Sequence, residues 1–190
     1  MGFLPIFCLQ TECVCNFFGL VKDMKRKTRF LTHAALLAAL YVALTHGQNL
    51  LFPGSTSWAI QFRVAEALCV FSLFTPAAIP GRTAGCLLYN ITNVGVLPLD
   101  ILMGTAASAL AALTMWLTRK WKIFGYPLFA MLMPALINAL LVGWELTIYF
   151  GGGFFLNALY VAIGEAGVSL TLGSCVYYAI KARKLDSRLF

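Results

Sequence analysis

Long apolar runs, separated by short polar or basic breaks, make up most of the chain between residues 30 and 180. A helix needs about 20 predominantly apolar residues to cross the hydrocarbon core of a bilayer. Read in this way, the runs predict six transmembrane helices. They cover residues 30–45, 59–76, 83–95, 100–117, 124–148 and 155–180.

The breaks between the runs contain the residues that favour turns and loops. Residues 46–58 hold two glycines, a proline and three hydroxyl residues, which predict a loop. Pro80, Gly81 and Arg82 predict a tight turn between the second and third spans. Three consecutive glycines at 151–153 predict the loop before the last span.

Composition supports the same class of protein. Of the 190 residues, 61% are hydrophobic and 11% are charged, and the mean hydropathy is +0.83. These values predict an all-α membrane protein with several spans. The net charge of +7 does not indicate a nucleic-acid partner, because the cations form short clusters between apolar runs. Such clusters are typical of membrane topology.

The distribution of Lys and Arg predicts the orientation. In the six-span arrangement thirteen of the fourteen cations fall on one side, in residues 22–29, 119–122 and 181–188 and at Arg82. The positive-inside rule places that side in the cytoplasm. We therefore expect a multi-pass protein of the bacterial cell membrane with both termini in the cytoplasm (N-in, C-in).

The character of the chain changes at Met24, where a basic cluster precedes the first span. We interpret residues 1–23 as an N-terminal extension, which a mis-assigned translation start would explain. Residues 24–184 then form one six-helix transmembrane domain, and residues 185–190 form a cytoplasmic tail.

In this topology the strongly polar residues of the spans lie in the outer half of the membrane or near its midplane. The candidates are Gln61, Arg63, Glu66, Asn90, Asn138, Glu145, Asn157 and Glu165. A charge at membrane depth costs at least ~2.5–3.5 kcal/mol, so it needs a partner or a wet cavity. Because the inner half holds almost no polar residues, the arrangement predicts an outward-facing polar pocket and not an ion conduit.

Two interpretations of Arg63 and Glu66 remain open. The residues are three positions apart and could pair on one helix. Such a pair could serve only to fix helix packing, or it could help to line the pocket. Glu145 and Asn138, seven residues apart, share one helix face.

The sequence contains no G-x-x-x-x-G-K-[ST] loop for nucleotide phosphates and no H-E-x-x-H or G-x-S-x-G motif. Cys13 and Cys15 have no His-bearing partner motif that would complete a zinc site. We expect no catalytic residue, metal or cofactor, and no enzyme activity.

Small residues recur along the first span at the spacing that lets two helices approach closely. Ala34 and Ala38 form one row, and Ala35, Ala39 and Ala43 form its neighbour. Spacing alone leaves open whether these rows meet a partner protein or another helix of the same chain.

Several polar motifs occur in a characteristic order. They are residues 60–68 (IQFRVAEAL), 76–81 (PAAIPG), 85–90 (GCLLYN), 100–104 (DILMG), 138–145 (NALLVGWE), 157–159 (NAL) and Gly164-Glu165. Over about residues 28–184 this pattern resembles the QueT family of queuosine-precursor transporters. These are substrate-binding (S) components of energy-coupling factor (ECF) transporters.

The resemblance implies an S-component-like bundle that binds a 7-deazaguanine compound from outside. It also implies partners, namely a transmembrane coupling subunit and two ATPases, with the alanine rows contacting the coupling subunit and residues 46–58 acting as a gate. The ring would be recognised through hydrogen bonds by residues among Glu66, Asn138, Glu145 and Glu165, with support from Asn157. Arg63 would keep Glu66 ionised. The alternatives are an S component for another vitamin-like heterocycle, or a scaffold protein whose polar residues only cement the bundle.

Overall fold

The computed structural model describes residues 4–53, 63–93 and 98–184, with side chains from Arg26 onward. Its elements are α1 (Leu4–Leu51), η1 (Val64–Leu73), α2 (Ala78–Thr92), α3 (Pro98–Thr118), α4 (Leu128–Phe150), α5 (Phe154–Val168), η2 (Ser169–Gly173) and α6 (Ser174–Ala182). Among them η1 is a 3₁₀-helix and η2 is a single π-helical turn. Within these ranges the only extended pairing is an isolated bridge between Ile123 and Tyr126.

Four helical stretches of the described chain are long and apolar enough to cross a membrane. They are Arg26–Leu51, Pro98–Thr118, Leu128–Phe150 and Phe154–Ala182. Large apolar side chains on these helices, such as Leu36, Leu102 and Leu136, are more than half exposed. Exposure on this scale suits contact with lipid, so the prediction of an all-α membrane protein is confirmed.

The second and third predicted spans differ from the structure. In place of a helix over 59–76 the chain forms the ten-residue η1, and in place of one over 83–95 it forms the fifteen-residue α2. A 3₁₀-helix rises about 2.0 Å per residue, so η1 covers about 20 Å of a hydrocarbon core that is about 30 Å thick. Six complete spans and the N-in, C-in orientation therefore stay predictions.

Two predicted breaks are also wrong in part. The predicted loop at 46–58 begins later, because α1 continues to Leu51, and residues 54–62 lie outside the described chain. Pro80, Gly81 and Arg82 do not form a turn but lie within the start of α2. Proline is tolerated there because the first N–H groups of a helix have no partner within it. α1 also passes Met24 without a break, so the change of composition there is not a helix boundary.

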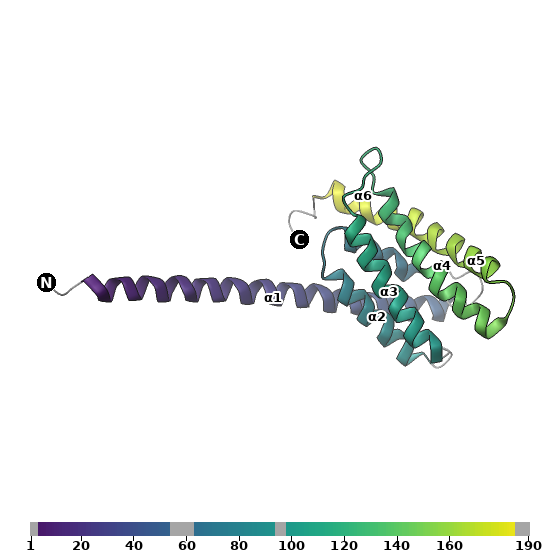
Figure 1. Cartoon of the computed structure of the whole chain (residues 1–190), viewed down its shortest axis with the longest axis horizontal. Coiled ribbons are helices and arrows are strands. Elements are labelled where there is room, and N and C mark those ends of the chain that lie inside the picture. Colours follow the sequence, from purple (N-terminus) through teal and green to yellow (C-terminus); the bar gives the residue numbers. More distant parts are fainter. Residues whose placement is uncertain (1–3, 54–62, 94–97, 185–190) are drawn as a thin grey trace.

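The helices pack in chain order around η1 (Figure 1). α1 packs on α2, α2 on α3, α3 on α4 and α4 on α5, while η1 contacts every other helix in the described part of the chain. The amino-terminal part of α1 projects from this bundle as a single helix. η1 is therefore the central element of the fold, and its side chains are placed to meet residues from all the surrounding helices.

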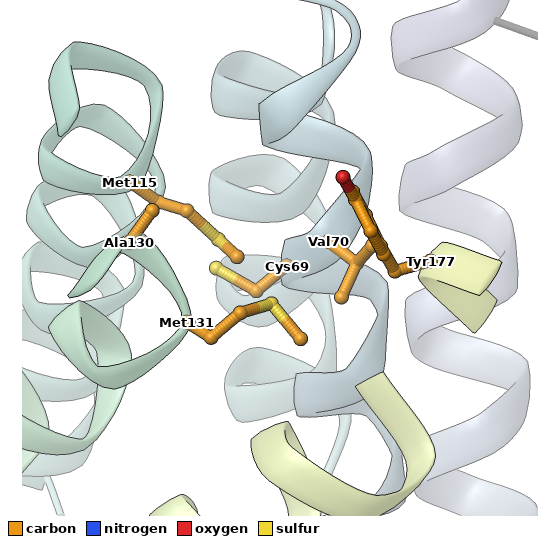
Figure 2. Packing of buried hydrophobic residues seen from close by; sticks show 6 residues of the cluster. All are labelled: Cys69, Val70, Met115, Ala130, Met131 and Tyr177. Carbon is orange, nitrogen blue, oxygen red and sulfur yellow. The ribbon is translucent and has the colours of Figure 1, made fainter. Parts of the chain in front are cut away.

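One side of η1 faces a sulfur-rich apolar core (Figure 2). Cys69 and Val70 of η1 pack there with Met115 of α3, Met131 of α4 and Tyr177 of α6. Ala130 completes the buried cluster. Thioether side chains are flexible enough to fill irregular gaps, which suits a core where a 3₁₀-helix meets three α-helices.

α1 and α2 approach so closely that two glycines are required. A Cβ atom on Gly81 would lie 2.5 Å from the backbone oxygen of Ala34, and one on Gly85 would lie 3.0 Å from that of Ala38. Ala34 and Ala38 are accordingly buried inside the bundle, whereas the neighbouring row, Ala35, Ala39 and Ala43, is exposed. The first row therefore packs against the same chain, and only the second row is accessible to a partner.

The last membrane stretch contains an irregular turn. Between α5 and α6 the five residues of η2 form a π-helical turn. The Ser169 hydroxyl donates to the backbone oxygen of Met131 at 2.6 Å, and a Cβ on Gly173 would lie 3.1 Å from Val70 and from Met131. This turn is thus fixed against α4 and η1.

We expect Gly81→Ala to destabilise the protein, because the added methyl group meets backbone that cannot turn aside. Overpacking of this kind costs about 1–3 kcal/mol of unfolding free energy, which should lower the melting temperature in detergent. Gly47→Ala is the matched control, since nothing lies within 4 Å of its Cβ position and alanine favours a helix. A melting temperature for Gly81→Ala at or above that of Gly47→Ala would contradict the close packing.

Candidate functional site

A buried ion pair joins η1 to α2. The carboxylate of Glu66 accepts a hydrogen bond from the guanidinium of Arg82, and their side chains are only 1% and 2% exposed, respectively. The hydroxyl of Tyr41, on α1, donates to the other carboxylate oxygen at 3.3 Å. Arg82 also donates to the sulfur of Cys69. Both Glu66 oxygens are therefore used within the protein.

This pair corrects the position expected for Arg82, which is buried in the core and not in a cytoplasmic turn. It also gives Glu66 a partner that the sequence analysis did not name, in addition to the expected influence of Arg63. Arg63 immediately precedes η1 in an extended conformation and is itself buried. Its charge interacts with Tyr41, Asp100 and Glu66, so it belongs to the same group of interacting polar residues. One signal of a buried role was available, because Arg82 has no Lys or Arg beside it in the sequence.

A second acidic group lies between α3 and α4. Glu145 is 2% exposed, and the carboxyl group of Asp100 is its side-chain neighbour. A carboxylate can only accept hydrogen bonds, whereas a protonated carboxyl group also donates one. Neither Glu145 oxygen has a hydrogen-bond donor among the described residues. Asp100 is a member of the site that the sequence analysis did not select, although it begins a predicted span.

A third acidic group lies between α4 and α5. Glu165 is 2% exposed, and its side-chain partner is the amide of Asn138. The charges of Glu66, Arg63 and Arg82 also act on Glu165. Its Oε2 atom has no donor in the described chain. Glu165 thus connects the ion pair of η1 to the α4–α5 interface.

The three remaining predicted residues have different environments. The amide nitrogen of Asn90 donates to the backbone oxygen of Asp100 at 2.9 Å, while its Oδ1 is buried without a donor in the described chain. The amide nitrogen of Asn157 donates to Thr147 Oγ1 and to the backbone oxygen of Gly151, each at 3.1 Å. These bonds secure the turn between α4 and α5. Gln61 lies outside the described residues.

Together these contacts form one connected polar cluster around η1. Its charged members are Arg63, Glu66, Arg82, Asp100, Glu145 and Glu165. Carboxyl groups outnumber guanidinium groups by four to two, and the atoms without a protein partner are mainly acceptors. A buried acceptor without a donor is costly. The cluster is therefore suited to a small molecule that offers several N–H or O–H donors.

Within the described ranges no group of three or more His, Cys, Asp and Glu side chains is arranged to hold a metal ion. The carboxyl groups instead form three pairs. Glu66 pairs with Arg82, Glu145 with Asp100, and Glu165 with Asn138. Each pair comes from two different helices, so a ligand that contacts all three would bind the helices together.

Comparison with known proteins identifies a family. The family model described as QueT transporter matches residues 31–182, which extend from within α1 to the end of α6. No curated protein and no solved structure matches the chain.

We expect Arg82→Met to be strongly destabilising, because it leaves the Glu66 carboxylate buried without its cation. Breaking a buried ion pair on one side costs about 3–5 kcal/mol, whereas replacing both partners is often nearly neutral. The double variant Glu66→Gln/Arg82→Met, which keeps an acceptor for Tyr41, should recover much of the loss. Melting temperatures and membrane yields of the wild type, both single variants and the double variant measure this coupling. Strictly additive losses would show that the two side chains do not depend on each other.

Proposed function

The chain belongs to the QueT transporter family, and we propose that it is the S component of an ECF transporter for a queuosine precursor. In this role it binds a 7-deazaguanine base, or a related nucleoside, in the cytoplasmic membrane of a bacterium. A transmembrane coupling subunit and two ATPases supply the energy, and the chain itself is a multi-pass membrane transporter subunit without a catalytic step.

The observation that carries this proposal is the set of buried acceptors that lack a protein donor. Glu145 contributes two such oxygens, and Glu165 and Asn90 contribute one each. The guanine-like edge of a 7-deazaguanine presents adjacent N–H donors, and one carboxylate can accept two of them. A donor-rich heterocycle would therefore remove the cost of burying these oxygens.

The contacts also rank the candidate residues. Glu66 already accepts from Tyr41 and Arg82, so its role is to hold η1 in place. Glu145 remains the first choice for the ring-reading residue, because both of its oxygens are without a protein donor. Glu165 is the second, with its orientation fixed by Asn138. Asn157 supports the site through the α4–α5 turn.

The exposed alanine row on α1 is the proposed docking face for the coupling subunit. Ala35, Ala39 and Ala43 are exposed, and small residues allow another helix to approach closely. An apolar groove of about 550 Å³, lined by Ala43, Leu44 and Leu51 with other residues, continues from this row. A partner helix lying along the row would extend into this groove.

The first test is the affinity of the purified protein for 7-cyano-7-deazaguanine, 7-aminomethyl-7-deazaguanine and queuine, measured by calorimetry. We expect Glu145→Gln to weaken binding of the preferred compound roughly tenfold to a hundredfold, because a ligand N–H would face an amide N–H. This range corresponds to a charged-group hydrogen bond worth ~1.5–3 kcal/mol.

Trp144→Phe is the control, since Trp144 is the neighbouring residue and is 50% exposed. It should leave the affinity unchanged. Wild-type affinity in a folded Glu145→Gln protein would remove Glu145 from the site. If none of the three compounds binds while an unrelated vitamin-like heterocycle does, the substrate assignment is wrong but the S-component role stands.

A second test concerns the partner. Ala39→Trp should leave ligand binding intact and reduce co-purification with the coupling subunit at least severalfold, because the indole would hold the two helices apart. Ala38→Trp should instead lower the melting temperature, since Ala38 packs on Gly85 inside the bundle. Ala106→Trp, an exposed position on α3, should affect neither property. Normal assembly of Ala39→Trp would place the docking face elsewhere.

A further inference from the structure

A basic pocket lies at the end of the bundle where η1, α3 and α6 finish and α4 begins. Its volume is about 370 Å³, and its walls include Leu73, Phe74, Arg119, Lys120, Lys122 and Lys181. The polar cluster around Glu66 shares none of these residues. The pocket is therefore a separate feature from the proposed substrate site.

Among the described residues that line this pocket, every charged side chain is a cation. Four of its eight lining residues are Lys or Arg, and none is Asp or Glu. Pro127, which caps the amino end of α4, is also in the lining, and the amino end of a helix carries a partial positive charge. These features together favour a bound anion.

Aromatic rings and a backbone oxygen position two of the cations. The guanidinium carbon of Arg119 lies 3.3 Å from the ring centroid of Trp116, and its NH1 donates to the backbone oxygen of that residue at 2.7 Å. The ammonium of Lys181 lies 5.7 Å from the ring centroid of Phe74. Side chains held in this way lose less freedom when an anion binds.

The surroundings of the pocket indicate the source of the anion. The connection between α3 and α4 exposes Trp121 by 63%, Ile123 by 51% and Phe124 completely. Apolar and aromatic side chains next to cations are typical of the level of lipid headgroups. A binding site for a soluble anion would have no need of this exposed apolar surface, whereas a lipid presents its phosphate and its acyl chains together.

We propose that this pocket binds the phosphate group of an anionic glycerophospholipid, with Arg119, Lys120, Lys122 and Lys181 around the headgroup. Basic pockets between transmembrane helices bind anionic headgroups in this manner. The orientation predicted from the distribution of Lys and Arg would place this pocket in the cytoplasmic leaflet. The inference does not depend on which substrate the protein transports.

The test uses the full chain, purified in a neutral detergent and titrated with phosphatidylglycerol, with bound lipid counted by native mass spectrometry. Phosphatidylcholine and inorganic phosphate serve as comparison ligands. Lys122→Gln/Lys181→Gln should weaken phosphatidylglycerol binding by roughly tenfold to thirtyfold, because each Lys or Arg near the membrane surface adds to the attraction for an anionic headgroup. Lys122→Arg/Lys181→Arg, which keeps both charges, should bind nearly as well as the wild type.

Arg29→Gln/Arg183→Gln is the matched control, because it removes two exposed cations that do not line the pocket. Preference for phosphatidylglycerol that is lost only in the pocket variant supports the proposal. Equal loss in the control would show general attraction to a positive surface and would overturn it. Binding of phosphatidylcholine to the wild-type protein as strongly as phosphatidylglycerol would also overturn it. Displacement of phosphatidylglycerol by millimolar inorganic phosphate would reassign the pocket to a soluble anion.

Discussion

The burial of Glu66 against Arg82 is the constraint on which the rest of the bundle depends. Removing two charges from water is expensive, and their attraction repays this only where the geometry is good and the remaining polar atoms are bonded. Here Tyr41 from α1 donates to the second Glu66 oxygen and Cys69 from η1 accepts from Arg82, while the Nε of Arg82 is buried without an acceptor in the described chain. Three segments of the chain must therefore be in place together, which explains why a short 3₁₀-helix can occupy the centre of a membrane protein.

This arrangement also separates the polar groups that are bonded within the protein from those that are not. Once Glu66 is satisfied within the protein, the buried carboxyl and amide oxygens without a described donor lie on the helices around it, at Glu145, Glu165 and Asn90. They come from α4, α5 and α2, respectively. A ligand that bonds to them would therefore connect three helices of the bundle.

The sequence predicted best what depends on local composition. The apolar run at 100–117 became α3, with bounds two residues earlier and one later, because the length of an apolar run limits a helix directly. Hydropathy could not distinguish η1 from a spanning helix, since a buried core segment and a lipid-facing one are equally apolar. The partner of Glu66 is sixteen residues away on another helix, and the choice between the rows of Ala34 and Ala35 depends on where α2 packs. Both depend on how the helices pack against each other, which the spacing of residues along one helix does not reveal.

The π-helical turn η2 has a consequence for how the last membrane stretch is built. In an α-helix each residue advances the side-chain direction by about 100°, and a π-turn accommodates one additional residue. Everything after Gly173 is therefore rotated relative to an uninterrupted continuation of α5. The rotation lets a single continuous stretch present Glu165 to the polar cluster and, further on, Tyr177 to the sulfur-rich core and Lys181 to the basic pocket. The removal of one residue within η2 would restore a regular helix. Tyr177 and Lys181 would then be rotated relative to Glu165, and the three side chains could not all keep their present positions.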